Sequence, residues 1–171
     1  NIDGLSSLTT VHDSLVVAAN LALTNIDGLA NLSFVGELMQ VSNNANLVNL
    51  DGLSGLTTLG ESLYISDNND LISIDGLSNI TEVPGDLTLT EHARLPNVNG
   101  LSSLTTVGDD LRISDNLALT DIDGLSSLTS VGADLYIDTN AALCQDSADA
   151  IIAACEVGGE VHSYGNFGPC P

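Results

Sequence analysis

The sequence predicts a mainly β fold, a parallel β-solenoid of six 24-residue coils closed by a short C-terminal cap. Two observations predict it. A phrase close to I-D-G-L-S-S-L-T-T-V recurs every 24 residues without insertion, and this pattern stops after Leu143. A gap-free repeat of this length indicates stacked units that share one core, because a single unit could not bury its apolar side chains alone. We expect one domain, with a solenoid over residues 1–145 and a cap over residues 146–171. The six coils start at Ile2, Ile26, Leu50, Ile74, Val98 and Ile122.

The pattern within one coil, counted from its first residue, separates inward from outward positions. Positions 1, 4, 7, 10, 14, 16 and 22 are apolar in nearly every copy. Positions 14 and 16 flank an outward position 15, which is the alternation of a strand with one buried face. The other apolar positions recur every three residues, which fits tight arcs better than helices. We therefore expect one short strand per coil, paired in parallel with the strands of neighbouring coils.

Position 19 is a polar row within this apolar pattern. An inward asparagine can hydrogen-bond the backbone of its own turn and of the next coil, and so satisfy groups that strand pairing leaves free. We predict a structural ladder in which His92 substitutes for asparagine in coil four. The ladder residues are Asn20, Asn44, Asn68, His92, Asn116 and Asn140.

A resemblance to a known family follows from these motifs. The nine residues from Leu63 to Leu71 read L-x-I-x-x-N-x-x-L and resemble the leucine-rich repeat. The continuation I-D-G-L-x-x-L-x-x-V-G looks more like the receptor L domain of insulin- and EGF-receptor ectodomains and of its relatives on bacterial surface proteins. The resemblance covers all six coils, but the coils here are more regular and lack cysteines. It implies a right-handed solenoid, extracellular or at the cell surface, that binds a partner without catalysis.

Composition excludes several classes of partner. The net charge is −21, there is no lysine, and Arg94 and Arg112 are the only arginines. Nucleic acid and anionic membranes need a basic surface, so we expect neither as a partner. No apolar run approaches the roughly 20 residues that span a bilayer, so we expect no membrane insertion. The chain begins at Asn1 without a targeting segment, so we expect a processed or trimmed product. The first coil is then exposed, covered by residues outside this chain, or stacked on another molecule.

Two outward rows have alternative interpretations. The Asp-Gly pair at positions 2 and 3 predicts an Asx-turn with glycine at positive φ, and a row of calcium sites is the alternative. The hydroxyl row at position 8 suits a strand exterior, and a flat ice-binding ladder is the alternative. Phe34 and Glu82 interrupt the neighbouring position 9, which argues against a continuous threonine array. The hydroxyl row contains Thr9, Ser33, Thr57, Thr81, Thr105 and Thr129.

Position 15, the outward residue of the main strand, is our candidate binding face. It changes in chemical class from coil to coil and carries tyrosine and arginine, which are frequent hot-spot residues of interfaces. Leucine-rich repeats commonly bind through this strand face, so the resemblance points the same way. The alternative is that an exposed strand position tolerates any residue. After Val16 in the first coil, the row continues with Gln40, Tyr64, Thr88, Arg112 and Tyr136.

The tail and coil four depart from the repeat. Residues 146–155 read as a short helix with acidic residues at its start, and it should cover the last coil. The three cysteines of the tail fit one disulfide and one free thiol. We predict Cys144–Cys170 with Cys155 reduced, because Cys144 directly follows the last core leucine. The tails of bacterial L-domain-like proteins point to the same pair. Pro84 and Pro96 suggest a changed turn in coil four.

Three functions remain as expectations. The first is an extracellular or cell-surface binding or adhesion module that recognises a protein or a glycan. The second is a structural subunit that stacks end to end into a fibre, and the third is an ice-binding solenoid.

We expect no enzyme, because the rows that hold His12, His92 and His162 predict no Ser-His-Asp arrangement. We also expect no metal and no cofactor. Asn31 and Asn79 begin triplets that match the N-glycosylation pattern.

Overall fold

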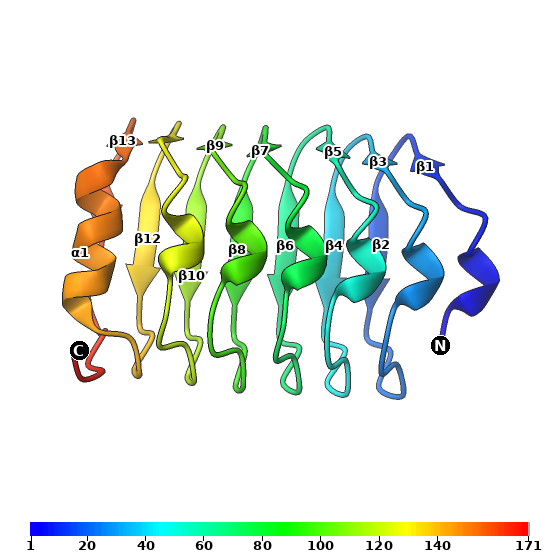
Figure 1. The fold of residues 1–171 in the computed structure, drawn as a ribbon, viewed down its shortest axis with the longest axis horizontal. Coiled ribbons are helices and arrows are strands. Elements are labelled where there is room, and N and C mark those ends of the chain that lie inside the picture. The colour runs from blue at the N-terminus through cyan, green and yellow to red at the C-terminus, as the bar shows by residue number, and fades with distance from the viewer. Residues whose placement is uncertain (171) are drawn as a thin grey trace.

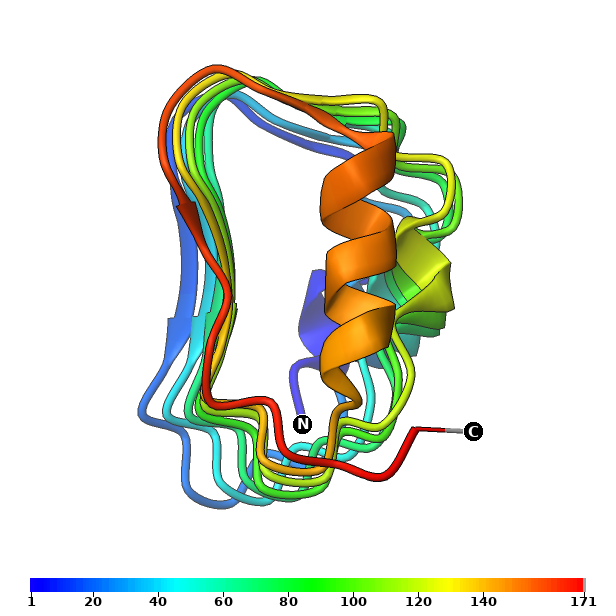
Figure 2. The same cartoon turned by 90° about the vertical axis from the view of Figure 1, so that its left-hand side faces the viewer.

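Residues 1–170, which the computed structural model describes, form a row of coils stacked along one axis (Figure 1). The expected fold class is confirmed: parallel strands repeat with the 24-residue period, and one α-helix, α1 (Gln145–Ala154), lies at the C-terminal end. Viewed along the axis, each coil is a closed turn with a long strand on one side and a short helical turn on the opposite side (Figure 2).

The long strands form one parallel sheet of seven strands, in the order β14-β12-β10-β8-β6-β4-β2. Equivalent residues pair in register, so every row of the repeat runs straight along the sheet; Gln40 pairs with Tyr64, and Arg112 with Tyr136. The strands are β2 (Leu15–Ala18), β4 (Met39–Ser42), β6 (Leu63–Ser66), β8 (Leu87–Thr90), β10 (Leu111–Ser114), β12 (Leu135–Asp138) and β14 (Val161–His162).

Two-residue strands form a second parallel stack that is interrupted at coil four. The orders are β1-β3-β5 and β13-β11-β9-β7. In the regular coils a glycine amide donates to the preceding coil, as Gly60 does to Val35 at 2.8 Å. Coil four has Pro84 there, which has no N–H to donate, so the sheet divides between coils three and four. The strands are β1 (Thr10–Val11), β3 (Phe34–Val35), β5 (Thr58–Leu59), β7 (Glu82–Val83), β9 (Thr106–Val107), β11 (Ser130–Val131) and β13 (Glu156–Val157).

The opposite side of each coil is a short 3₁₀ helix. These helices are η1 (Asp3–Leu5), η2 (Asp27–Leu29), η3 (Asp51–Leu53), η4 (Asp75–Leu77), η5 (Asn99–Leu101) and η6 (Asp123–Leu125). The strand, arc and helix rows enclose one continuous apolar core. Within it, Leu53, Leu63 and Ile65 are fully buried. The apolar residues of the first coil are less covered, and Leu5 is 41% exposed.

Glycine at position 3 allows close approach between coils. A Cβ on Gly28 would lie 2.0 Å from the carbonyl oxygen of Ile2. Within residues 1–170 only Gly165 has a positive φ among the glycines, so the expected positive φ of the Asp-Gly pair is wrong. The side chain that accepts the turn N–H lies two residues before the aspartate, as Asn25 Oδ1 does for the amide of Asp27 at 3.3 Å. The same contact is made by Asn49, Ser73, Asn97 and Asp121.

The structure places the position-19 side chains in a continuous ladder along the core. Asn68 is fully buried; its Oδ1 accepts the N–H of Asn44 at 3.0 Å, and its Nδ2 donates to the carbonyl of Val41 at 2.9 Å. Asn44, Asn116 and Asn140 repeat this geometry. Asn20, in the first coil, is exposed. Each rung therefore satisfies backbone groups of the coil before it.

His92 makes only part of the contacts of a ladder asparagine. Its Nδ1 lies 3.3 Å from the N–H of Asn68, so the ladder is continuous through coil four. Its Nε2 is buried without a hydrogen-bond partner among the described residues. Burial lowers the pKa of His92 to about 4, so the ring is neutral at pH 7.

The residue before each rung has a left-handed backbone, which asparagine, aspartate and glycine favour but Ala19, Glu91 and Thr139 do not. The ladder hydrogen bonds hold it there, because they fix the side chain that follows. The residues with positive φ are Ala19, Asn43, Asp67, Glu91, Asp115, Thr139 and Gly165.

After α1 the chain returns to the course of a seventh coil. Strands β13 and β14 pair with β11 and β12, and Leu135 pairs with Val161. Asn166 supplies a further ladder rung, because its Oδ1 accepts the N–H of Asn140 at 3.2 Å. The segment that we expected to be only a cap therefore adds β14 to the seven-stranded sheet and β13 to the four-stranded sheet of short strands.

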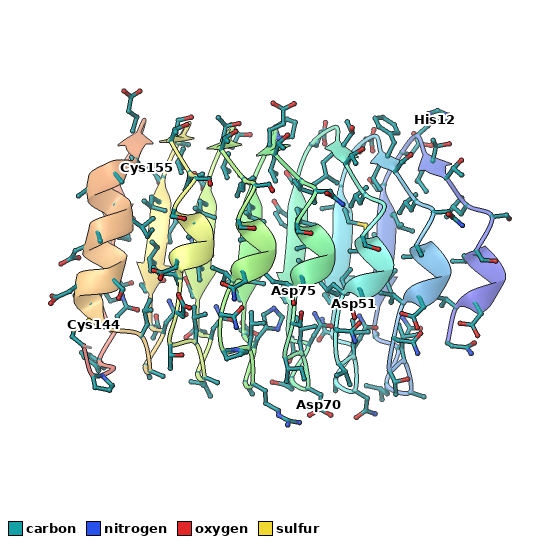
Figure 3. All side chains as sticks on the ribbon, in the orientation of Figure 1. His12, Asp51, Asp70, Asp75, Cys144 and Cys155 are labelled. Carbon is teal, nitrogen blue, oxygen red and sulfur yellow. A yellow bond between two sulfur atoms is a disulfide. The ribbon has the colours of Figure 1, made fainter. Side chains whose placement is uncertain are left out.

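The Cys144–Cys170 disulfide is present, as expected, and it joins equivalent sites of coils six and seven. The two cysteines are 26 residues apart, and their Cα atoms are 4.9 Å apart. That distance matches the spacing of about 4.8 Å between paired strands. Cys155 is free and half-buried, and burial raises the pKa of its thiol. Figure 3 shows Cys144 and Cys155 at opposite ends of α1.

Candidate functional site

The candidate face is the outer surface of the seven-stranded sheet. The structure aligns the predicted residues Gln40, Tyr64, Thr88, Arg112 and Tyr136 in one row, because each pairs with the next in register. All five are half-buried. His162, which the sequence argument did not place in this row, pairs with Tyr136 and extends it.

Three side chains of this row are stacked. The Cζ atom of Arg112 lies 3.7 Å from the centroid of the Tyr136 ring. The rings of Tyr136 and His162 are 4.5 Å apart at centroid and nearly parallel, with an interplanar angle of 4°. Neighbouring side chains therefore lie along both faces of Tyr136 and hold its ring between them.

The two arginines differ in their contacts. Arg94 pairs with Asp70 at 3.1 Å on the exposed lower turns. Arg112 makes no such ion pair among the described residues and lies on an aromatic ring instead. A cation on an aromatic face keeps its outward N–H groups available to a partner.

Carboxylates at coil position 13, just before the long strands begin, border the stack of Arg112, Tyr136 and His162. Tyr136 donates its hydroxyl proton to Asp134 Oδ2 at 3.0 Å, and Tyr64 donates to Asp86 Oδ2 at 2.6 Å. These bonds raise the pKa of both tyrosines. The N–H of Glu160 and then the Tyr136 hydroxyl lower the pKa of Asp134. The tyrosine protons are thus already bonded within the protein, and the phenol oxygens face outward as acceptors.

The other border of the stack carries Tyr164 and Asp138. Tyr164 is 60% exposed, and hydrogen bonding to Asp138 raises its pKa. The hydroxyl of Ser114 donates to Asp138, which holds this carboxylate in place. Sequence reasoning missed Tyr164 because the chain shifts by two residues relative to the 24-residue period between coils six and seven. The Val-Gly pair at Val157 and Gly158 repeats positions 10 and 11 and could have revealed the return of the coil.

The position-8 hydroxyls form hydrogen bonds between neighbouring coils of the solenoid. Thr105 Oγ1 donates to the carbonyl of Thr81, and Thr129 Oγ1 to that of Thr105, both at 2.9 Å. Ser33 and Thr57 make the same bond to the preceding coil. This bond accounts for hydroxyl residues in the row without a surface ligand.

The acidic row of position 2 is exposed on the helical side of the coils. Figure 3 shows Asp51 and Asp75 on neighbouring coils there. Among residues 1–170, the one group of three possible metal-binding side chains within 4.8 Å consists of Cys144, Asp146 and Cys170. Both of these cysteines are in the disulfide, so their sulfur atoms are not available as thiolate ligands.

A shallow groove of about 470 Å³ runs along the lower turns below the sheet. Asp67, Glu91 and Asp115, three of the left-handed residues, line it together with Ala93 and Leu117. This groove is not predictable from the sequence, because it depends on the backbone conformation at position 18.

The sequence matches no model of a known protein family and no curated protein. Within residues 1–170, no helix has the length and apolar character that crossing a bilayer requires.

Proposed function

We propose that the chain is a non-catalytic binding or adhesion module of the leucine-rich-repeat or receptor L-domain type, extracellular or at the cell surface. It recognises a protein or a glycan through the outer face of the seven-stranded sheet. The observation that carries the proposal is the ordered stack of Arg112, Tyr136 and His162. Cation and aromatic groups held in place before binding lower the entropy cost of recognition. The disulfide is compatible with an oxidising compartment, and the strong negative charge with a soluble surface module.

Adhesion of coated beads to cells tests this proposal. Beads carrying the wild-type chain should adhere, and Arg112→Ala/Tyr136→Ala/His162→Ala should abolish adhesion. The matched control, Thr58→Ala/Thr106→Ala/Ser130→Ala, truncates outward residues of the short strands. It should adhere like the wild type. Equal loss in both variants would contradict the face assignment, and wild-type beads that adhere to none of a broad panel of cell types would contradict the function.

A second candidate is a subunit that self-associates end to end. The first coil favours it, because Leu5 is 41% exposed and β2 pairs only with β4 among the described strands. Sedimentation velocity over a hundredfold range of concentration distinguishes the two. A fibre subunit should form larger species that Leu8→Glu abolishes and Arg112→Ala leaves unchanged, whereas the binding module should sediment as one species.

A further inference from the structure

The proposed contact surface is concentrated in the last three coils. The outward strand residues of the first two coils are Val16 and Gln40, whereas Arg112, Tyr136 and His162 follow one another towards the C-terminal end. Tyr164 lies beside them, so this region holds two of the three tyrosines of the chain. We call Arg112, Tyr136, His162, Tyr164 and Asp134 the stack surface.

We infer that the stack surface binds a hydroxyl-rich glycan that carries no negative charge. This inference rests on the proposed binding function and names its ligand class. The direction of the hydrogen bonds supports this ligand class. Tyr136 donates its proton to Asp134. Its phenol oxygen and the Asp134 carboxylate therefore offer acceptors, while Arg112 offers donors; the Nε2 atom of His162 already faces Glu160 Oε2 at 3.5 Å.

Sugar hydroxyl groups match this mixed surface, because each of them can donate and accept. A hydroxyl can donate to Asp134, which is half-buried, and accept from the guanidinium of Arg112. Hydrogen bonds that involve a charged group are stronger than neutral ones, so a few of them can orient a ligand on a shallow face.

The charge of the region excludes acidic ligands. Arg112 lies among carboxylates: Asp110 and Asp134 act electrostatically on Tyr136, and Asp138 and Asp115 on Tyr164. Together with the net charge of −21, these groups repel sulfated and uronic-acid glycans. Uncharged sugars and amine-bearing sugars remain, and both offer the same hydroxyl donors.

The shape of the surface favours a glycan over a protein. Protein hot spots place an aromatic or apolar side chain in a desolvated pocket. Here Arg112 and His162 lie against the two faces of Tyr136, so ring edges and polar atoms remain for the partner. The stack spans two coil steps, about 10 Å at the spacing of paired strands, which suits a short run of sugar rings along the solenoid axis.

Affinity electrophoresis and calorimetry test the inference with stated probes. They are hexamers of β-1,4-linked glucose, xylose and N-acetylglucosamine, the amine-bearing hexamer of glucosamine, heparin, and a polylysine peptide. We expect binding to at least one neutral or amine-bearing oligosaccharide and none to heparin. Arg112→Ala and Tyr136→Ala should each weaken binding by about tenfold or more. Tyr136→Phe keeps the stacked ring and should weaken it less.

Thr58→Ala is the matched control, because Thr58 is an outward residue of the short strand β5 and lies outside the seven-stranded sheet. It should bind like the wild type, and all variants should melt within a few degrees of it. High salt should weaken binding of the amine-bearing hexamer and leave binding of the neutral hexamers unchanged. This difference distinguishes an amine-bearing sugar from a neutral sugar as the ligand.

Other outcomes overturn the inference in distinguishable ways. Binding to polylysine alone, or bead adhesion that persists without any oligosaccharide binding, would replace the glycan with a protein partner and leave the binding function in place. A preference for heparin would refute the charge argument. The absence of both oligosaccharide binding and bead adhesion would refute the glycan and the proposed function together.

Discussion

The inward row at position 19 and the outward row at position 15 belong to the same coils. They differ in how much the residue type varies and in how far the side chains are buried. The inward row is asparagine in all coils except coil four, and Asn44, Asn68 and Asn140 are fully buried and make nearly identical bonds. The outward row changes from valine to glutamine, tyrosine, threonine and arginine, and its members are half-buried or exposed. The difference indicates that the repeated inward row stabilises the stacked coils, and the variation of the outward row is the basis of our proposal that it contacts a partner.

The largest expected effect is the loss of one ladder rung. Asn68→Leu removes the acceptor of the Asn44 amide and the donor to the Val41 carbonyl, both in the buried core. Each of these two buried groups costs roughly 1–3 kcal/mol when it loses its partner, so the free energy of unfolding should fall by about 2–6 kcal/mol. Urea denaturation measures it.

The control for this rung is the next residue. Asn69 is exposed, so Asn69→Leu should change stability by less than about 0.5 kcal/mol. Equal stability of the Asn68→Leu variant and the wild type would show that the ladder does not hold the coils together.

Loss of the disulfide should cause the next largest fall in the free energy of unfolding. Cys144→Ser/Cys170→Ser removes the bond that closes a 26-residue segment. Chain entropy assigns about 3.5 kcal/mol to a loop of that length. Thermal unfolding of the variant, beside wild type with and without reductant, checks the value. Cys155→Ser should leave the melting temperature unchanged.

A second disulfide can be introduced at the same coil position between two other neighbouring coils. Val48 and Ile72 occupy the site equivalent to Cys144 in adjacent coils, and the amide of Ile72 donates to the Val48 carbonyl at 2.9 Å. Val48→Cys/Ile72→Cys should therefore oxidise to a second disulfide and stabilise by up to about 3 kcal/mol. Val48→Cys/Thr120→Cys, three coils apart, should stay reduced; thiol counting decides the outcome.

His92 should make stability depend on pH. Its folded pKa of about 4 lies below the value of about 6.5 expected in the unfolded chain. Protonation therefore favours the unfolded state: stability from this group is constant above pH 6.5, falls as pH drops, and levels off near pH 4. The loss reaches about 3 kcal/mol.

His92→Asn should remove this pH-dependent loss and restore a full rung. At pH 7 it should stabilise by about 1 kcal/mol, since the buried Nε2 has no partner. Unfolding free energies of wild type and variant between pH 7 and pH 4.5 test the sign. Parallel pH curves would contradict the assignment.

The smallest expected effects are on the outward row. Tyr64→Ala loses a half-buried ring and its bond to Asp86, and Thr88→Ala loses a half-buried hydroxyl. Thr88→Ala should change the free energy of unfolding by less than about 0.5 kcal/mol, and Tyr64→Ala by about 1 kcal/mol. A cost for Thr88→Ala as large as that of Asn68→Leu would mean that both rows are structural.

The sequence predicts the coils, the strand and the ladder because each is a fixed position in an unbroken period. Features that depend on contact between coils were not predictable in the same way. The glycine of the Asp-Gly pair is needed because the preceding carbonyl is close, not because its φ is positive. Three of the left-handed residues, Ala19, Glu91 and Thr139, are of types that give no indication of that conformation.

The candidate site was predicted only in part, for a similar reason. Arg112 and Tyr136 follow from the period, but His162 does not, since α1 shifts the numbering by two residues before the coil returns. The stacked geometry depends on side-chain directions across three strands. A single coil contains no information about them.

Adjacent residues of β10 test the central claim most directly, because Arg112 faces outward and Ile113 is fully buried. Bead adhesion and unfolding free energy should be measured for Arg112→Ala and Ile113→Ala at a temperature where both are folded. The account predicts that Arg112→Ala loses adhesion with a stability change of at most about 1 kcal/mol. It predicts that Ile113→Ala keeps adhesion and loses about 2–5 kcal/mol. Adhesion that survives Arg112→Ala, or that is lost in folded Ile113→Ala, would contradict it.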